Sequence, residues 1–148
     1  MEIEKEIQST NFANSYQKAS VNIVFTYNWL NSIIKLELDK SGITNQQFNV
    51  LRILRGQHPN PATINILKDR MLDKMSDASR IVDRLVQKDL VTRNVNKKDR
   101  RAVDILINEK GLDLLDHIKM ENTYKDFQVN LTEDEAEQLS GLLDKFRG

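Results

Sequence analysis

The sequence contains no cysteine, and only two of its 148 residues are proline and five are glycine. The absence of cysteine excludes disulfides, thiol-based redox sensing and cysteine-ligated metals, and it is typical of proteins of the reducing cytoplasm. No apolar run approaches the roughly 20 residues that span a bilayer, and the acidic opening MEIEKEIQST is unlike a signal peptide. We therefore expect one cytoplasmic domain over residues 1–148.

Signatures of catalysis and of metal binding are also missing from the sequence. No serine stands in a nucleophile elbow, and no glycine-rich phosphate loop occurs. The two histidines, His58 and His117, lie far apart, and the acids Glu133–Glu135 fit the start of a helix. We therefore expect no enzymatic activity, no cofactor and no bound metal.

Charge is balanced in sum but uneven along the chain. The sequence holds 22 Lys and Arg against 22 Asp and Glu, so its net charge is zero. Residues 68–101 contain eleven basic and six acidic side chains, which leaves +5 there and −5 elsewhere. Because affinity for phosphates depends on the local potential at the contact face, this segment favours a polyanionic partner. A solvated charged surface explains the same numbers, so charge is only supporting evidence.

The stretch Ser76–Ile107 is the most informative pattern in the chain. It begins with a helical run whose apolar positions are Ala78, Ile81, Val82, Leu85 and Val86. Two strand-like runs follow, Leu90–Val95 and Ala102–Ile107, and the cationic segment between them predicts the tip of a hairpin. The other helix face carries short polar groups and guanidiniums that suit base edges and phosphates. A winged-helix DNA-binding protein is therefore the leading hypothesis.

The first forty residues predict one long helix that ends at Gly42. Its apolar positions recur at spacings of three and four, at Ile23, Tyr27, Leu30, Ile34 and Leu38. Further apolar residues widen this stripe beyond what one neighbouring helix can cover. We therefore expect the helix to pack against a partner subunit.

Shorter helices are predicted on either side of the hairpin. A capping box at Thr44 starts a helix over Asn45–Arg55, and Thr63 caps a short one that leads toward Ser76. Two short helices joined by a tight turn are typical of a helix-turn-helix, whose second helix enters the major groove. Beyond the hairpin we expect one helix from Asn108 to about residue 127, and a last one from about residue 131.

Five segments in this order make the chain resemble the MarR family of bacterial transcription regulators over nearly its whole length. They are Gln47–Leu54, Ser79–Leu85, Leu90–Arg93, Asp99–Val103 with its Asp-x-Arg wing signature, and Asn108–Gly111. The resemblance implies a mainly α fold with a small β-hairpin wing. Residues 44–107 would form the winged helix-turn-helix, and residues 1–41 and 109–148 would form dimerisation helices.

The resemblance also implies a function. Each subunit of a homodimer would place its recognition helix in the major groove and its wing in the flanking minor groove of a pseudo-palindromic double-stranded operator. Such regulators usually repress transcription and are released by small aromatic or anionic effectors. A winged-helix module that binds another protein without reading DNA is the alternative, because the fold serves both uses.

Two positions depart from the family pattern. Asp89 stands where the family commonly has glycine at the end of the recognition helix. Because aspartate adopts a left-handed backbone at some cost, we expect the turn to be kept. The wing tip begins with Asn96-Lys97-Lys98, which changes its charge and its detailed contacts.

The candidate DNA-contacting residues lie on the recognition helix and the wing. They are Ser76, Asp77, Ser79, Arg80, Arg84, Lys97, Lys98, Asp99, Arg100 and Arg101. Arg101 suits a narrow minor groove, with Asp99 aiming its guanidinium, although an exposed ion pair explains the same residues. Ser76 and Asp77 cap the helix in either case, and Asp77 suits DNA only where it accepts from a cytosine amino group. Asp83 and Arg84 have the alternative role of bracing the helix.

An effector pocket is the last candidate site. We expect it between the dimerisation helices and the helix-turn-helix, with Phe25, Tyr27, Trp29, Phe48 and His117 as candidates for its wall. Aromatic residues at helical spacing are more often plain core, so this assignment competes with a purely structural one.

Overall fold

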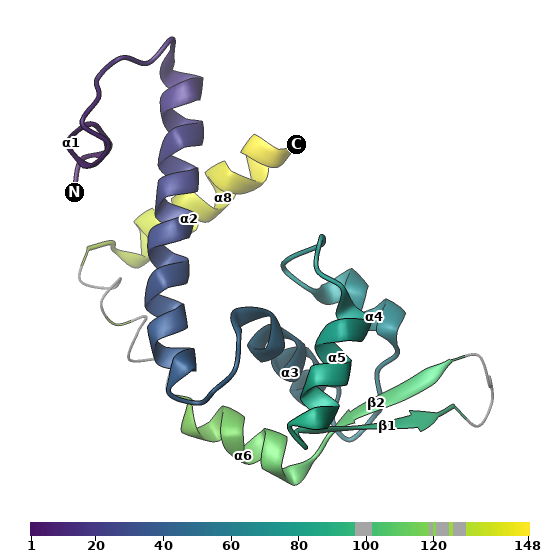
Figure 1. Cartoon of the computed structure of the whole chain (residues 1–148). Helices are drawn as coiled ribbons and strands as arrows, with labels where there is room; N and C mark the ends of the chain where they lie inside the picture. Colours follow the sequence, from purple (N-terminus) through teal and green to yellow (C-terminus); the bar gives the residue numbers. More distant parts are fainter. Residues whose placement is uncertain (97–101, 119, 121–124, 126–129) are drawn as a thin grey trace.

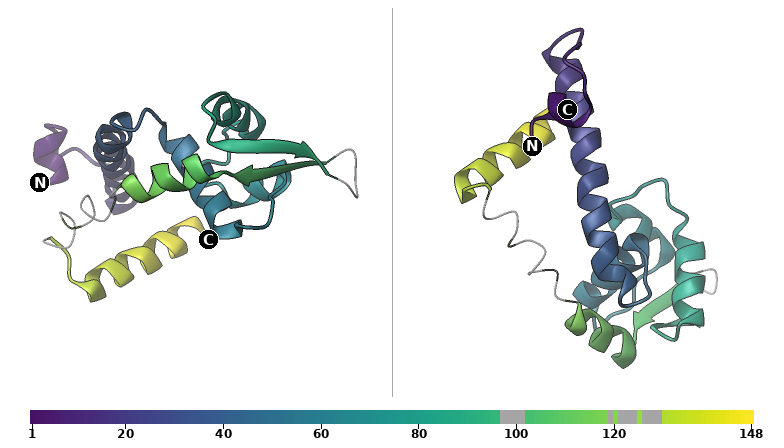
Figure 2. Two further views of the ribbon diagram at one scale, coloured as in Figure 1. Left: turned by 90° about the horizontal axis from the view of Figure 1, so that it is seen from below. Right: turned by 60° about the vertical axis from the view of Figure 1, so that its left-hand side comes forward.

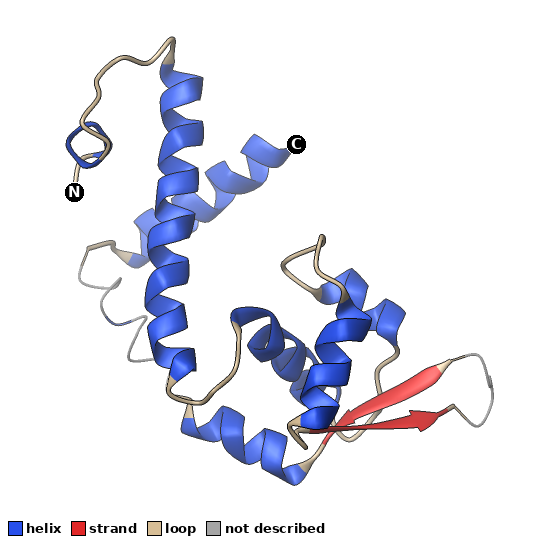
Figure 3. Ribbon diagram, viewed as in Figure 1, coloured by secondary structure: helices blue, strands red, loops and turns tan. Residues whose placement is uncertain are grey.

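The computed structural model describes residues 1–96, 102–118, 120, 125 and 130–148. The described chain is mostly helical and contains one two-stranded antiparallel hairpin, which confirms the predicted fold class (Figure 3). Its elements are α1 (Ile3–Glu6), α2 (Ser15–Asp39), α3 (Asn45–Gln57), α4 (Ile64–Arg70), α5 (Ala78–Gln87), β1 (Val91–Val95), β2 (Val103–Ile107), α6 (Glu109–His117) and α8 (Glu133–Arg147).

The N-terminal segment forms two helices, so the prediction of one helix over the first forty residues is wrong. α1 ends after Glu6, and Gln8 takes a positive φ of 54° that breaks the helical path. α2 begins only at Ser15, where the Asn14 side chain accepts a hydrogen bond from the Gln17 backbone at 2.9 Å. Gly42 closes the other end of α2 with a φ of 66°, as its glycine predicts.

The core lies where α3, α4, α5, α6 and the hairpin converge (Figure 1). Thr44 forms the predicted capping box with Gln47, which starts α3 and directs its apolar face inward. The largest fully buried side chains are Leu38, Val50, Leu51, Leu54, Leu67, Met71, Val82, Leu85 and Ile105. Most of them come from α3, α4 and α5, so the two helices of the helix-turn-helix are fixed on α3. We call residues 45–117 the reader module.

Two long helices extend outside the reader module. α2 projects away from it, and α8 lies apart from it in Figure 1 and in the right-hand view of Figure 2. Leu38 is the buried residue of α2, and α8 has none. Large apolar side chains stand exposed on both helices, among them Val24, Tyr27, Leu36, Leu139, Leu142 and Phe146. Among the described residues, no helix combines the length and apolar character needed to cross a membrane.

The turn after α5 takes the left-handed conformation expected of it. Asp89 has a φ of 56°, and the Asn108 side chain donates to its backbone carbonyl at 3.0 Å. Lys110 lies 3.7 Å from the Asp89 carboxylate and also donates to the Lys88 carbonyl. These contacts hold an aspartate where a glycine would be relaxed.

α6 packs closely against the end of this turn. Asn108 caps it by accepting from the Gly111 backbone at 2.9 Å. A Cβ at Gly111 would lie 2.3 Å from the Leu90 carbonyl oxygen and 2.7 Å from Cγ1 of Ile107, so only glycine allows this approach. α6 ends at His117, short of the expected residue 127, because Ile118 is extended. Most of the residues in between lie outside the described part of the chain.

Candidate DNA-binding surface

The recognition helix α5 is amphipathic and begins at Ala78. The Asp77 side chain is its N-cap and accepts a hydrogen bond from the Arg80 backbone at 3.2 Å. Ala78, Val82 and Leu85 are fully buried against the core. Since these three residues define the inward face, the opposite face of α5 is turned to solvent.

The outward face of α5 carries guanidinium groups. Arg80 and Arg84 are exposed, and Ser79 is half-buried beside them. Within the described part of the chain, no ion pair joins either arginine to an acid. Both guanidiniums are therefore available to phosphates or to guanine edges, which are the acceptors that arginine reads in DNA.

An ion pair joins α5 to the wing. The Arg93 guanidinium on β1 donates to the Asp83 carboxylate at 2.6 Å. Asp83 thus braces the helix, as its alternative interpretation predicted, whereas Arg84 does not share this contact. Sequence reasoning missed Arg93, because the pairing of a strand residue with a helix residue ten positions earlier has no local pattern.

The turn that leads into α5 is held by a compact hydrogen-bond network. The Asp73 carboxylate accepts from the Ser76 hydroxyl at 2.6 Å and from the Met75 backbone at 3.0 Å. These two contacts hold the pKa of Asp73 below its usual value. Asn49 on α3 accepts from the Leu72 backbone at 3.0 Å. The Asp-x-x-Ser spacing was the available signal for part of this network.

The root of the wing is firmly attached to the reader module. β1 pairs with β2 in a register that runs from Val91 opposite Ile107 to Val95 opposite Val103. Ala62 exchanges two backbone hydrogen bonds with Ile105, both at 2.9 Å, which adds a third chain segment to the hairpin. The predicted tip residues Lys97, Lys98, Asp99, Arg100 and Arg101 lie outside the described residues. Their DNA contacts stay a prediction.

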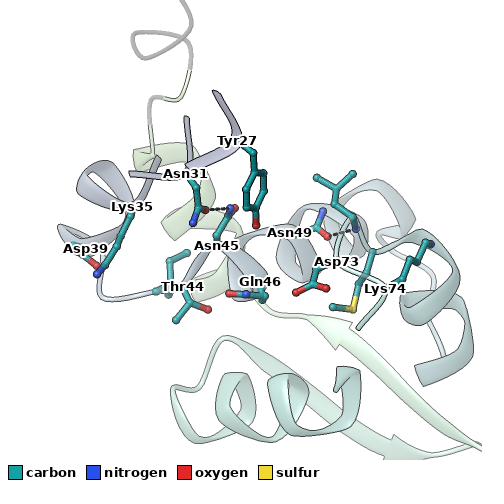
Figure 4. A pocket seen from close by; sticks show the side chains of 13 residues that line it. Tyr27, Asn31, Lys35, Asp39, Thr44, Asn45, Gln46, Asn49, Asp73 and Lys74 are labelled. Atoms are coloured by element: carbon teal, nitrogen blue, oxygen red, sulfur yellow. Dashed lines mark hydrogen bonds between the residues drawn. The ribbon is translucent and has the colours of Figure 1, made fainter. Parts of the chain in front are cut away.

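Two adjoining cavities lie between α2 and the reader module. The first has a volume of about 620 Å³, and Tyr27, Asn31, Asn45, Gln46 and Asn49 reach into it (Figure 4). The second, of about 580 Å³, shares several of these residues. Asn45 donates to Asn31 at 2.9 Å where the two cavities meet, which links α3 to α2.

Only some of the residues expected in the effector pocket line these cavities. Tyr27 lines both cavities and Phe48 lines the second, whereas Phe25, Trp29 and His117 line neither of the two. Nδ1 of His117 lies 2.6 Å from the Asp113 carbonyl oxygen, so the ring is held against its own helix. The amide-bearing residues of α2 and α3 that do line the cavities were missed, because neutral polar residues on a helix give no pattern.

Comparison with known proteins agrees with this geometry. The model of the MarR family matches residues 43–103. The HTH-type transcriptional regulator MhqR of Bacillus subtilis is 29% identical over 119 residues, which are 79% of this chain and 81% of that protein. A mutant MarR from E. coli, solved with operator DNA, is 25% identical, and the match covers 92% of this chain and 98% of that one with a TM-score of 0.79.

A more distant structure shares the fold. The organohalide-sensing RdhR regulator, in its 2,4-dichlorophenol-bound form, is 22% identical, with 93% of this chain and 86% of that one covered and a TM-score of 0.78. The recognition helix, the attached hairpin and these matches agree on one family. Over residues 43–103 the chain matches the MarR family, and its fold is that of MarR regulators.

Proposed function

We propose that the protein is a sequence-specific double-stranded DNA-binding transcriptional regulator that represses by occupying a promoter. The observation that carries this proposal is the outward face of α5, where Arg80 and Arg84 stand exposed beside a hairpin anchored through Ala62 and Arg93. Helix and wing are the two elements that such a fold inserts into adjacent grooves. The relatives named above are transcriptional regulators, which are not enzymes. We place its action in the cytoplasm.

The protein-binding alternative is not favoured. Unpaired guanidiniums on the outward helix face suit DNA directly, because arginine forms bidentate hydrogen bonds with phosphates and with guanine edges. In the described chain, both arginines of α5 lack an acidic partner. The relative solved with operator DNA uses the same fold.

We expect a homodimer built from α2 and α8. Tyr27 is 63% exposed and Leu142 is 64% exposed, although both are large apolar side chains on long helices. Burying such a surface against a second copy removes apolar area from water and stabilises the assembly. Sedimentation at micromolar concentration should therefore give the mass of a dimer, and Leu142→Glu should shift it toward monomer.

Glu137→Ala is the control for that change. It alters the same helix at a position roughly opposite Leu142, so the mass should stay that of the dimer. A compact, stable monomer of the unmodified chain at the same concentration would contradict the dimer.

Two-fold symmetry dictates the form of the operator. We expect selection from randomised duplexes to return a pseudo-palindrome whose half-sites lie about one helical turn, roughly 10 base pairs, apart. The Ala substitutions Arg80→Ala and Arg84→Ala should weaken binding to the selected duplex. Recovery of single asymmetric sites only would argue against the proposed mode of binding, and recovery of no sequence preference would argue against the function.

We further propose that the second cavity binds a small aromatic or anionic effector. Among the described residues, its wall includes Arg52 and Arg70 and contains no carboxylate. The Arg52 guanidinium lies 5.8 Å from the centre of the Phe48 ring. Arg52 can therefore bind an anionic group of a ligand while Phe48 contacts its aromatic ring. A cavity of this size suits a small ligand. The dichlorophenol bound by the RdhR regulator supports this class of effector.

Benzoate and 2,4-dichlorophenol are suitable probes of this cavity. We expect at least one of them to raise the melting temperature and to lower the affinity for the selected duplex, because a ligand that binds one conformation shifts the equilibrium toward it. Arg52→Ala should reduce the response to benzoate more than the response to the neutral phenol. Release from DNA by peroxide or micromolar zinc, with no response to a panel of aromatic acids, would refute the proposal.

A further inference from the structure

The turn between α4 and α5 carries an exposed methionine at the entrance of the recognition helix. Met75 is 94% exposed, and it stands two residues before the N-cap of α5. Its position is continuous with the proposed DNA-binding face, because N-terminal residues of a recognition helix are those that reach base edges.

This exposure does not come from a loose loop. The backbone N–H of Met75 donates to Asp73 at 3.0 Å, and the next residue, Ser76, donates its hydroxyl to the same carboxylate at 2.6 Å. Asn49 on α3 holds the Leu72 backbone at 3.0 Å. The turn is therefore fixed on both sides of Met75, and docking of its side chain requires little ordering of the backbone.

The ammonium group of Lys74, the residue before Met75, is bound to α4. Nζ of Lys74 donates to the backbone carbonyl of Asp69 at 2.5 Å and to that of Lys68 at 3.3 Å, both in α4. These bonds hold the Lys74 ammonium against α4. The group that the turn presents just ahead of Ser76 is thus a flexible, polarisable thioether and not a charge.

We propose that Met75 contacts the C5-methyl group of a thymine in the major groove and so determines a preference for thymine in each half-site. This inference rests on the proposed DNA-binding function. The thymine methyl is the apolar group that the major-groove edges of the bases offer, and apolar side chains recognise it by contact. Phosphates and the other base edges offer hydrogen-bonding or charged groups, which a thioether cannot match.

Replacement of thymine by uracil tests the contact, because it removes the methyl and leaves base pairing intact. Each dT of the selected duplex is changed singly to dU, and affinities are measured for the unmodified protein and for Met75→Ala. At one position in each half-site, we expect dU to lower the affinity of the unmodified protein about fourfold. This is the effect of losing one buried methyl-sized group. Met75→Ala should bind the dT and dU duplexes equally at that position.

Two further variants separate the contact from a general effect on the helix. Met75→Leu keeps an apolar side chain and should retain most of the uracil penalty. Val86→Ala removes an apolar group at the other end of α5 and should leave that penalty unchanged. Uracil penalties that are the same in Met75→Ala as in the unmodified protein at every position would overturn the inference. That result leaves the proposed function standing, whereas failure of the unmodified protein to select any duplex would refute the function itself.

Discussion

Arg101→Ala is expected to weaken operator binding strongly while fold and dimer stay intact. In the sequence, Arg101 ends the predicted wing tip, and β2 begins two residues later at Val103. A guanidinium placed in a narrow minor groove is favoured by the concentrated negative potential there. Its loss should cost about 1–3 kcal/mol per subunit, by comparison with other base-reading contacts, and both subunits contribute.

Fluorescence anisotropy at matched salt, together with the melting temperature, measures this effect. Asp99→Ala is the informative companion, because it removes the group that aims the guanidinium but also removes a negative charge near phosphate. It should therefore weaken binding less. Lys97→Ala and Lys98→Ala should act mainly by making the salt dependence shallower. If the affinity of Arg101→Ala for DNA were within twofold of that of the parent, the wing would not contribute to DNA binding as proposed.

Gly111→Ala should destabilise the fold strongly for a change of one methyl group. The new Cβ would meet the Leu90 carbonyl oxygen at 2.3 Å, and backbone cannot move aside as a flexible side chain can. α6 must then shift away from the turn at Asp89. Overpacking of this kind costs about 1–3 kcal/mol, and the collision with backbone places this variant toward the upper end.

Denaturant unfolding of Gly111→Ala and Gly56→Ala measures the difference. Gly56 lies in the last turn of α3, and a Cβ there would have no neighbour within 4 Å. Gly56→Ala should thus be neutral or stabilising by up to about 1 kcal/mol, because alanine loses less backbone entropy in a helix. Equal stability of the two variants would show that α6 does not pack as described.

The sequence predicted the elements whose signals are local. Capping at Thr44 and the helical period placed the start of α3 at Asn45, where the structure has it. The hairpin strands were expected from Leu90 and Ala102, and each begins one residue later. Asp89 took its left-handed backbone because position, and not residue preference, decides the turn.

The features that were missed depend on contacts between distant segments or on backbone torsion. The apolar stripe used to predict the first helix begins only at Ile23, so the helical period gave no information about the break at Gln8, where φ is positive. The bridge between Ala62 and Ile105 joins residues that are far apart in the chain. Phe25 and Trp29 share α2 with the cavity residue Tyr27, but a one-dimensional pattern does not say which turn of a helix faces a cavity.

The pairing of Arg93 with Asp83 also bears on how many counterions DNA releases when the protein binds. A cation displaces ions from a phosphate only if its charge is free to replace them. In the described chain, the charge of Arg93 is balanced by the Asp83 carboxylate, whereas Lys74 and Lys88 donate to neutral backbone carbonyls and keep their charge. The slope of affinity against salt concentration should therefore reflect fewer charges than the basic residues of this segment would suggest.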